Sequence, residues 1–308
     1  MPRSSVLPAF ADGSIVTVGT FDGVHLGHRD IVARVRERAE ATGLAGVLVT
    51  FRPHPLAVVN PAAAPLLLTP DDEQLDALAD SGPLSVVVLP FTPLLAKYSA
   101  EAFVSELLIA RYGMRELVIG YDHGLGRGRQ GDAAALSEHG ERLGFQCHVV
   151  PPTVDAAGAP ISSSAIRTSI AHGNLQRAER ALGRPYAFRG TVVPGSQRGR
   201  DLGYPTLNLE LPTLRKLLPP EGVYAVRAQS RRGSFGGMMN LGTRPTFGEL
   251  ERTLEVHLFD VHGDWYGESV SIEVIRRLRD VTKFEGVEAL VAQLGRDAES
   301  ARLALTQA

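Results

Sequence analysis

Apolar and polar positions follow two different patterns along the chain. Before Arg184, short apolar runs alternate with helical patterns, of which Asp30 to Ala41 and Ala100 to Tyr112 are the clearest. The apolar runs predict buried strands at Ser14–Gly19, Ala45–Phe51, Leu84–Leu89, Glu116–Gly120 and Gln146–Val150. Strands that alternate with helices form parallel βαβ units, so we expect an open α/β sheet that binds ligands at the carboxyl ends of its strands.

From Arg184 onward, strand-like segments follow one another and are separated by turns rich in Gly and Pro. They lie at Ala187–Val193, Gly222–Gln229, Phe235–Asn240, Thr253–Asp260 and Ser269–Leu278. This pattern predicts an antiparallel β-barrel. The apolar spacing from Val287 to Ala301 adds a C-terminal helix, and Ile166 to Leu182 predicts a short helical connection. We therefore expect two domains, residues 1–183 and residues 184–308.

Composition narrows the class of protein. The 308 residues are 44% hydrophobic and 21% charged, and the formal net charge of -2 offers no general basis for binding nucleic acid. The single cysteine, Cys147, rules out an intrachain disulfide framework. We find neither an apolar run of ~18 residues nor a signal-peptide pattern, so we expect a cytoplasmic protein with no membrane partner.

The segment from Gly19 to His28 is the first candidate site, because it links the first strand to the first helix. Glycines there let the backbone approach a phosphate, and the helix N-terminus presents N–H groups to it. His25 and His28 add donors, while the lysine of a P-loop is missing. The alternatives are that these histidines are turn or cap residues, or that they bind zinc together with His54. We favour the phosphate site.

The motif GTFDGVHLGH, Gly19 to His28, resembles the signature of the HxGH nucleotidylyltransferases, and specifically of bacterial FAD synthetases. The segments Phe51–Pro55, Gly120–Asp122 and Ile161–Arg167 resemble further motifs of that family in the same order. The resemblance implies a Rossmann-like sheet and the reaction of ATP with FMN to give FAD and pyrophosphate, with Mg²⁺. The residues implied to bind ATP are Gly19, Thr20, Phe21, Gly23, Asp122, Ser162 and Ser163, and those implied to bind flavin are Pro53 and His54.

Transfer of an adenylyl group explains the charged residues of this site. The FMN phosphate is already an anion, so it needs no general base to attack the α-phosphate of ATP. His25 and His28 would stabilise the α-phosphate and the leaving group, and Arg167 would hold the outer phosphates. Two positions depart from the family pattern: Ser164 replaces a threonine, and His123–Gly126 replaces an aromatic-rich loop.

Residues Gly126 to Gly131 match G-x-G-x-x-G, the fingerprint of a dinucleotide site. The strand ends too far before the first glycine for the tight turn that such a site needs. The required acidic residue would have to be Asp155, which falls in a loop beyond the next strand. We therefore expect a solvated loop carrying Arg127 and Arg129, and no nicotinamide site.

The second candidate site runs from Gly195 to Asn208. Backbone amides and arginines in its Gly-rich part could wrap phosphates. Thr206 and Asn208 share one face of a strand and offer two neutral oxygen ligands of the kind that suits Mg²⁺. Taken alone, the segment fits a Gly-rich hairpin with solvated polar side chains better than a phosphate site.

Gly203–Asn208 resembles the G-[FY]-P-T-x-N motif of riboflavin kinases, and the later segments Gly222–Tyr224, Asn240–Thr246, Glu255–Leu258, Tyr266–Gly267 and Leu278–Arg279 resemble further landmarks of that family. The resemblance implies that riboflavin is phosphorylated by ATP to FMN, with Glu255 as catalytic base. It implies that Thr206 and Asn208 hold Mg²⁺ and phosphate, that Gly195, Arg200 and Gly203 also contact ATP, and that Arg279 lies near the flavin.

The two resemblances cover nearly the whole chain, in the order seen in bifunctional bacterial riboflavin kinase/FAD synthetases. The expected ligands are riboflavin, FMN, FAD and ATP. The altered loop at His123 motivates one alternative, a riboflavin kinase whose N-terminal module binds flavin or nucleotide without catalysis. The sequence predicts no oligomeric state.

Overall fold

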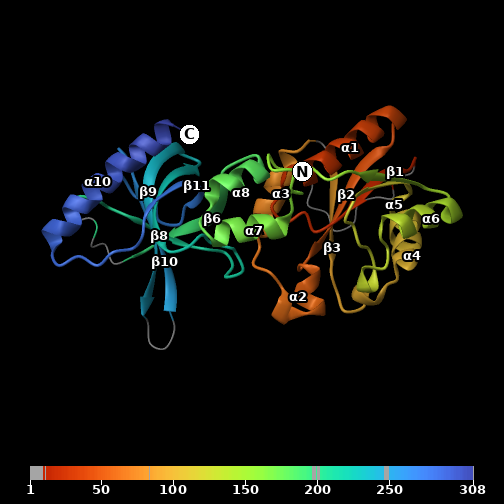
Figure 1. The fold of residues 1–308 in the computed structure, drawn as a ribbon, viewed down its shortest axis with the longest axis horizontal. Helices are drawn as coiled ribbons and strands as arrows, with labels where there is room; N and C mark the ends of the chain where they lie inside the picture. Colours follow the sequence, from red (N-terminus) through yellow and green to blue (C-terminus); the bar gives the residue numbers. More distant parts are fainter. Residues whose placement is uncertain are drawn as a thin grey trace. The chain divides into compact units, whose positions relative to one another are not determined.

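The structure is a computed structural model that describes residues 10, 12–82, 84–195, 199, 202–245 and 250–307, with the backbone alone at 71, 244, 245 and 250–252. The chain divides into two compact units (Figure 1). Unit 1 comprises Met1–Leu67 and Gln74–Ser162, and unit 2 comprises Leu68–Glu73 and Ser163–Ala308. The boundary of these units at Ser163 precedes the predicted module boundary at residue 183, and the latter stays a prediction about function.

Unit 1 is built on a five-stranded parallel sheet of order β3-β2-β1-β4-β5. Its strands are β1 (Ser14–Val18), β2 (Ala45–Arg52), β3 (Ser85–Pro90), β4 (Met114–Gly120) and β5 (Gln146–Val150). The predicted α/β sheet is confirmed. The strand order reverses between β1 and β4, and in open sheets the ligand crevice forms at such a point, outside the carboxyl ends of the strands.

Side-chain alternation along these strands builds two cores, one on each face of the sheet. Val16 and Ile119 pack with Phe103 and Leu136 on one face, whereas Ile15 and Val118 pack with α1 on the other. Figure 1 shows α1 on one side of the sheet and α4 to α6 on the other.

The helical segments of the chain are α1 (Leu26–Thr42), α2 (Pro55–Val59), η1 (Pro61–Ala63), α3 (Asp71–Ala79), η2 (Leu95–Lys97), α4 (Ala100–Ala102), the π-helical η3 (Phe103–Ile109), α5 (Ala110–Tyr112), η4 (Arg127–Arg129), α6 (Ala133–Leu143), α7 (Ser163–Ala171), α8 (Leu175–Leu182) and α10 (Val287–Thr306).

Unit 2 contains a closed antiparallel barrel of order β10-β7-β6-β11-β8-β9, which confirms the predicted barrel. Its strands are β6 (Tyr186–Val193), β7 (Leu207–Glu210), β8 (Gly222–Ser230), β9 (Gly233–Pro245), β10 (Leu250–Leu258) and β11 (Ser269–Arg279). Alternate residues such as Tyr224 and Val256 fill the interior. Ala225 and Met238 face outward and pack against Ala301 of α10, the predicted C-terminal helix.

A buried lysine fixes the segment Leu68–Glu73 within unit 2. The Nζ of Lys216 donates to the carbonyl oxygens of Leu68 and Ala187, both at 2.6 Å, and to Oε2 of Glu73 at 2.5 Å. Oε1 of Glu73 accepts from the Arg189 N–H at 2.8 Å. Lys216 is 3% exposed, so its charge depends on these partners.

Across the described ranges, no helix is long and apolar enough to cross a membrane.

Candidate functional site

The loop between β1 and α1 has a backbone that is fixed by burial. Phe21 and Val24 adopt positive φ angles of 46° and 41°, which side-chain-bearing residues rarely do. Both side chains lie in the core at 2% and 0% exposure, and the Val24 N–H donates to the Phe21 carbonyl at 3.1 Å. Gly23 between them has a φ of 89°. Burial therefore holds a strained turn in one conformation, which a pre-organised phosphate site requires.

The two histidines of the motif lie together at the N-terminus of α1. His25 is the N-cap, and its Nδ1 accepts from the His28 N–H at 3.3 Å. The two rings stack with centroids 3.6 Å apart, and the His28 ring also contacts Phe21 at 5.1 Å. Because Nδ1 of His25 accepts, the proton of the neutral ring resides on Nε2. His25 is thus a cap residue, as in the alternative interpretation, and its ring still carries a donor beside the positive end of the helix, as the favoured phosphate site needs.

Polar contacts join the strand ends around this loop. The Thr20 carbonyl accepts from the Thr50 hydroxyl at 3.3 Å and from the Gln74 side chain. Thr153, which follows β5, donates to the Asp30 carboxylate of α1. A Cβ at Gly27 would lie 3.3 Å from the His25 ring, so a side chain there would crowd the imidazole. Within unit 1, the carboxyl edge of the sheet is therefore one connected polar region.

The predicted flavin-binding pair Pro53–His54 follows β2 at the same edge of the sheet. Nδ1 of His54 accepts from the Leu56 N–H at 3.2 Å, so His54 caps α2. Among the residues that the structure describes, no group of three or more His, Cys, Asp or Glu side chains could hold a metal ion. The structure thus gives no support to the alternative in which His25 and His28 bind zinc with a third ligand such as His54.

The loop after β4 explains the G-x-G-x-x-G match by packing. Leu125 and Gly131 exchange two backbone hydrogen bonds of 2.9 Å, and Leu125 enters the core at 5% exposure. A Cβ at Gly126 would overlap the Ala100 backbone, and one at Gly131 would lie 2.5 Å from the Ala100 Cβ. Close chain approach thus accounts for these two glycines without a nicotinamide dinucleotide.

Asp122 and His123 open this loop. Nη2 of Arg129 donates to the Asp122 carbonyl at 2.7 Å, and Arg127 and Arg129 are exposed, as predicted. The His123 ring is partly covered, and its Nε2 is fully buried with no hydrogen-bond partner among the described residues. Burial, and then the Arg129 charge, lower the pKa of His123 to about 4. The ring is therefore neutral at pH 7.

The predicted ATP-binding serines and Arg167 fall at the start of α7. Ser162 is the last residue of unit 1, and Ser163 is the first residue of α7 in unit 2. Arg167 lies one turn into that helix, whose buried side is formed by Ile166 and Ile170. The structure describes Arg167 within unit 2 alone, so its role beside the histidines stays a prediction.

In unit 2, strand register brings the predicted kinase residues into one row. Glu255 on β10 pairs directly with Asn208 on β7 and with Asn240 on β9. Asn240 pairs with Val223 on β8, which pairs with Arg279 on β11. Directly paired residues project from the same face of a sheet. We call this set, Asn208, Glu255, Asn240, Val223 and Arg279, the barrel row.

The barrel row faces the outside of the barrel at its polar end. Leu254 and Val256, on either side of Glu255, are 5% and 0% exposed and point into the interior. Asn240 is a member that the sequence did not reveal, because only the register of two strands places it beside Glu255. The predicted base therefore lies between two amide side chains.

Glycine makes room for Asn208 at the end of the row. A Cβ at Gly195 would overlap the Asn208 amide, so only glycine leaves that side chain its place. Thr206 lies two residues before Asn208, just ahead of β7, and Gly203 has a φ of 78°. Arg200 lies outside the described residues. The Thr206 hydroxyl and the Asn208 amide oxygen are neutral ligands of the kind that suits Mg²⁺, so the residues present fit that ion.

Arg279, predicted to lie near the flavin, carries an ion pair. Its Nη2 donates to Oδ2 of Asp297 on α10 at 2.7 Å, and its Nε contacts both carboxylate oxygens at 2.9 and 3.0 Å. Its guanidinium also lies 5.6 Å from the centroid of the Phe284 ring. Sequence reasoning missed Asp297, although an aspartate on the apolar side of a helix is a signal of a buried partner.

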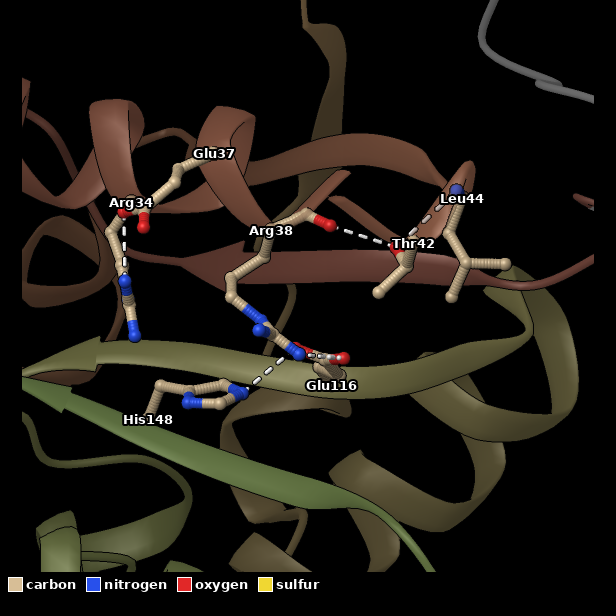
Figure 2. A network of polar contacts seen from close by, with 7 residues as sticks. All are labelled: Arg34, Glu37, Arg38, Thr42, Leu44, Glu116 and His148. Carbon is tan, nitrogen blue, oxygen red and sulfur yellow. Dashed lines mark hydrogen bonds and ion pairs between the residues drawn. The ribbon is translucent and has the colours of Figure 1, made fainter. Parts of the chain in front are cut away.

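Another ion pair with a buried carboxylate lies on the sheet of unit 1 (Figure 2). Nε and Nη2 of Arg38, on α1, each donate to a carboxylate oxygen of Glu116 on β4 at 2.8 Å. His148 on β5 contacts the same carboxylate at 2.7 Å through its Nε2. The hydrogen bond from Arg38 is the main cause that lowers the pKa of Glu116. None of these three residues belongs to a predicted site, so we regard the cluster as a tie between α1 and the sheet.

These features define a class of protein. A parallel sheet with paired histidines at the N-terminus of its first helix fits a nucleotidylyltransferase, and the barrel row is a candidate for a second phosphate site in the same chain. Comparison with known proteins makes the class specific. Residues 7–165 match the family described as FAD synthetase, and residues 182–305 match the family described as riboflavin kinase.

Relatives of known function match nearly the whole chain. A bifunctional riboflavin kinase/FMN adenylyltransferase of Escherichia coli K12 is 36% identical over 292 residues, which are 94% of this chain and 92% of that protein. The protein of the same name from Bacillus subtilis is 33% identical over 94% of this chain and 91% of its own length. The chain belongs to the bifunctional riboflavin kinase/FMN adenylyltransferase family.

A solved structure shares the fold of the whole chain. It is described as a macrolide-efflux protein from Streptococcus pneumoniae and superimposes with a TM-score of 0.85 at 33% identity. The match covers 96% of this chain and 95% of that protein. The combination of α/β unit and barrel described above is thus found together in a second chain.

Proposed function

We propose that this chain uses ATP twice: its barrel phosphorylates riboflavin to FMN, and its α/β unit adenylylates FMN to FAD with release of pyrophosphate. The observation that carries the proposal is the presence in one chain of two separate polar sites, His25 with His28 and the barrel row. Both of the matching families cover their own unit, and the relatives named above carry out both activities.

In the adenylyl transfer, an oxygen of the FMN phosphate attacks the α-phosphorus of ATP, and the bond to the pyrophosphate oxygen breaks. Negative charge grows on the α-phosphate and the leaving group. The His25 and His28 rings and the first-turn N–H groups of α1 lie where they can stabilise that charge. We assign contacts with ATP to Gly19, Thr20, Phe21, Gly23, Asp122, Ser162 and Ser163, with Arg167 on the outer phosphates, and contacts with flavin to Pro53 and His54.

In the kinase reaction, Glu255 takes the proton of the terminal ribityl hydroxyl as that oxygen attacks the γ-phosphorus of ATP and ADP departs. Asn208 and Asn240 are the register partners of Glu255 on either side, and we assign to them the positioning of its carboxylate. Thr206 and Asn208 would hold Mg²⁺, which supplies positive charge to the phosphates when bound. We assign Gly195, Arg200 and Gly203 to ATP and Arg279 to the flavin.

Two variants of the full chain test whether the sites act separately. His28→Ala removes a charge-stabilising donor, so FAD formation should fall about 100- to 1,000-fold while FMN still accumulates from riboflavin. Glu255→Gln should stop FMN formation while added FMN is still converted to FAD. Chromatography of the flavins after incubation with ATP and Mg²⁺ measures both reactions. Loss of both reactions in either folded variant would contradict the proposal.

The wild-type chain supplied with FMN, ATP and Mg²⁺ tests the alternative of a non-catalytic N-terminal module. The departure at His123–Gly126 motivates that alternative, although Leu125 of this loop is packed in the core. We expect FAD and pyrophosphate in equal amounts. A folded chain that makes FMN but no FAD would support the alternative.

We also propose that the adenylyltransferase module spans residues 1–183 and the kinase module residues 184–308, in the cytoplasm. The use of ATP in both reactions and the single cysteine, Cys147, support this location. Expression of residues 184–308 alone tests the module boundary: the fragment should phosphorylate riboflavin. A fragment that folds only when α7 and α8 are included would move the boundary to the start of α7.

A further inference from the structure

Arg279 has its charge and most of its hydrogen-bonding capacity taken up within unit 2. Asp297 accepts from Nε and Nη2, and the Asp280 carbonyl accepts from Nη1 at 2.9 Å. The Asp297 side chain is 4% exposed and the Arg279 side chain 22%. Nε2 of Gln293 donates to Oδ1 of Asp297 at 2.8 Å, so the carboxylate is held from both sides.

This arrangement decides which ligand Arg279 can recognise. A guanidinium paired with a buried carboxylate has its charge neutralised locally, and it is therefore a poor partner for a phosphate. One N–H remains on each of Nη1 and Nη2 after the contacts above, since each of these nitrogens carries two. These two N–H donors are fixed in place, and the ion pair to which they belong has no net charge. They therefore suit neutral acceptors, such as the carbonyl oxygens of a flavin ring.

The place of Arg279 in the barrel row supports the same ligand. Three strand steps separate it from Glu255, through Asn240 and Val223. At the usual spacing of neighbouring strands, these steps amount to about 14 Å along the barrel surface. β10 and β11 lie three strands apart in either direction around the closed barrel, so riboflavin contacts both residues only if it follows this curved surface, with its hydroxyl chain at Glu255 and its ring at Arg279.

We propose that Asp297 is a positioning residue of the kinase site, which sets the orientation and neutralises the charge of Arg279 so that Arg279 donates to the flavin ring. The proposal rests on the kinase activity proposed above. Asp297 does not touch substrate in this scheme; it acts through Arg279. It links the C-terminal helix α10 to flavin recognition.

The helix has other anchors, so Asp297 can be changed without detaching it. Ala301 and Ala304 pack against Met238 and Phe259 on the barrel. A second ion pair, Arg302 with Asp260, also joins α10 to the barrel, with contacts of 2.8 and 2.9 Å. That pair is exposed, and Arg302 lies five residues, about 7.5 Å, further along α10 than Asp297, which makes Asp260→Asn a control for a pair outside the barrel row.

Steady-state kinetics of Asp297→Asn in the full chain test the proposal. We expect the KM for riboflavin to rise about 10-fold, the loss expected when a charge-assisted hydrogen bond is weakened. The kcat and the KM for ATP should change less than about 2-fold, because neither Glu255 nor the phosphate contacts are altered. Asp297→Glu keeps the charge and should recover most of the riboflavin affinity, and Asp260→Asn should match the wild type.

Two measurements separate positioning from a structural effect. The rate of FAD formation from added FMN reports on unit 1 and should be unchanged in every variant. Thermal unfolding followed by the fluorescence of Trp265, the single tryptophan, reports on the barrel. An unchanged KM for riboflavin in folded Asp297→Asn would overturn the proposal, and so would a fall in kcat and in both affinities together. A wild-type chain that cannot phosphorylate riboflavin would instead overturn the kinase activity itself.

Discussion

Removal of the Arg38 side chain should destabilise unit 1 strongly, although Arg38 lies in no predicted site. In Figure 2 its guanidinium faces the Glu116 carboxylate, which is 7% exposed as a side chain and also contacts His148. Arg38→Met keeps most of the aliphatic stem and deletes the partner of a buried charge. Breaking such a pair costs about 3–5 kcal/mol when both groups are buried. Because Arg38 is 27% exposed and His148 remains, we expect about 2–4 kcal/mol.

The same helix provides the control. Arg34 forms an ion pair with Glu37 at 2.7 Å, but these side chains are 40% and 65% exposed. Exposed pairs one turn apart on a helix contribute about 0.5 kcal/mol or less, so Arg34→Met should barely change the free energy of unfolding. Urea unfolding followed by far-UV circular dichroism measures both variants, while Trp265 fluorescence reports the barrel separately.

The pH dependence sharpens the test. The hydrogen bond from Arg38 lowers the pKa of Glu116, so the folded state keeps this carboxylate charged at pH values where the unfolded state takes up a proton. The pair therefore contributes its full stability above the pKa of an ordinary glutamate and loses it as the pH falls through the lowered pKa. The difference between wild type and Arg38→Met should shrink below about pH 4.5. A cost for Arg38→Met no larger than that for Arg34→Met at pH 7 would refute the reasoning.

The buried strands of unit 1 could be predicted well from the sequence, because a strand of a parallel sheet is covered on both faces and therefore forms a continuous apolar run. Ala45–Phe51 was predicted and Ala45–Arg52 observed, and Gln146–Val150 agrees at both ends. Helix boundaries were harder to predict. The first helix begins at Leu26 rather than Asp30, because the His25 cap starts it before any apolar periodicity appears. The short helix α3 was missed entirely.

In the barrel, glycines concealed the length of a strand. Phe235–Asn240 was predicted, but β9 runs from Gly233 to Pro245. A Cβ at Gly236 would lie 2.8 Å from Leu305 of α10, and one at Gly237 would lie 2.5 Å from the His257 carbonyl. These glycines look like turn residues in the sequence. In the fold they let the helix and the neighbouring strand approach β9 closely.

In the candidate sites, residues close together in the sequence could be predicted as neighbours, whereas neighbours from distant parts of the chain could not. His25 and His28 could be predicted as a pair because three positions separate them at one helix start. The neighbours of Glu255 could not, because strand register is set by the whole barrel. Glu116 shows the limit most clearly: its partner Arg38 lies 78 positions away, and no local pattern distinguishes a buried glutamate from a solvated one.

Three further substitutions test the packing of single groups. The partly covered His123 ring has a pKa of about 4 in the folded state, so the unfolded state binds more protons between about pH 6.5 and 4. Wild-type stability should therefore fall by up to about 3 kcal/mol as the pH is lowered through that window. His123→Gln should flatten this slope in a pH series of urea unfolding, and an unaltered slope would exclude His123 as its source. Gly126→Ala should cost about 2–4 kcal/mol, because the new Cβ meets the Ala100 backbone and because a φ of 75° with a ψ of -179° is open almost only to glycine. Gly144→Ala, in the left-handed helical region with nothing within 4 Å, should cost about 1 kcal/mol. Equal thermal shifts for the two glycine variants would contradict that packing argument. Lys216→Met leaves the Glu73 carboxylate, which is 14% exposed as a side chain, without its cation, so the unfolding midpoint of the barrel reported by Trp265 fluorescence should fall by the equivalent of about 3–5 kcal/mol. Adding Glu73→Gln to Lys216→Met should recover part of that loss, because the buried charge is then absent. A double variant no more stable than Lys216→Met alone would show that the lost hydrogen bonds of Nζ, rather than the unpaired charge, determine the cost.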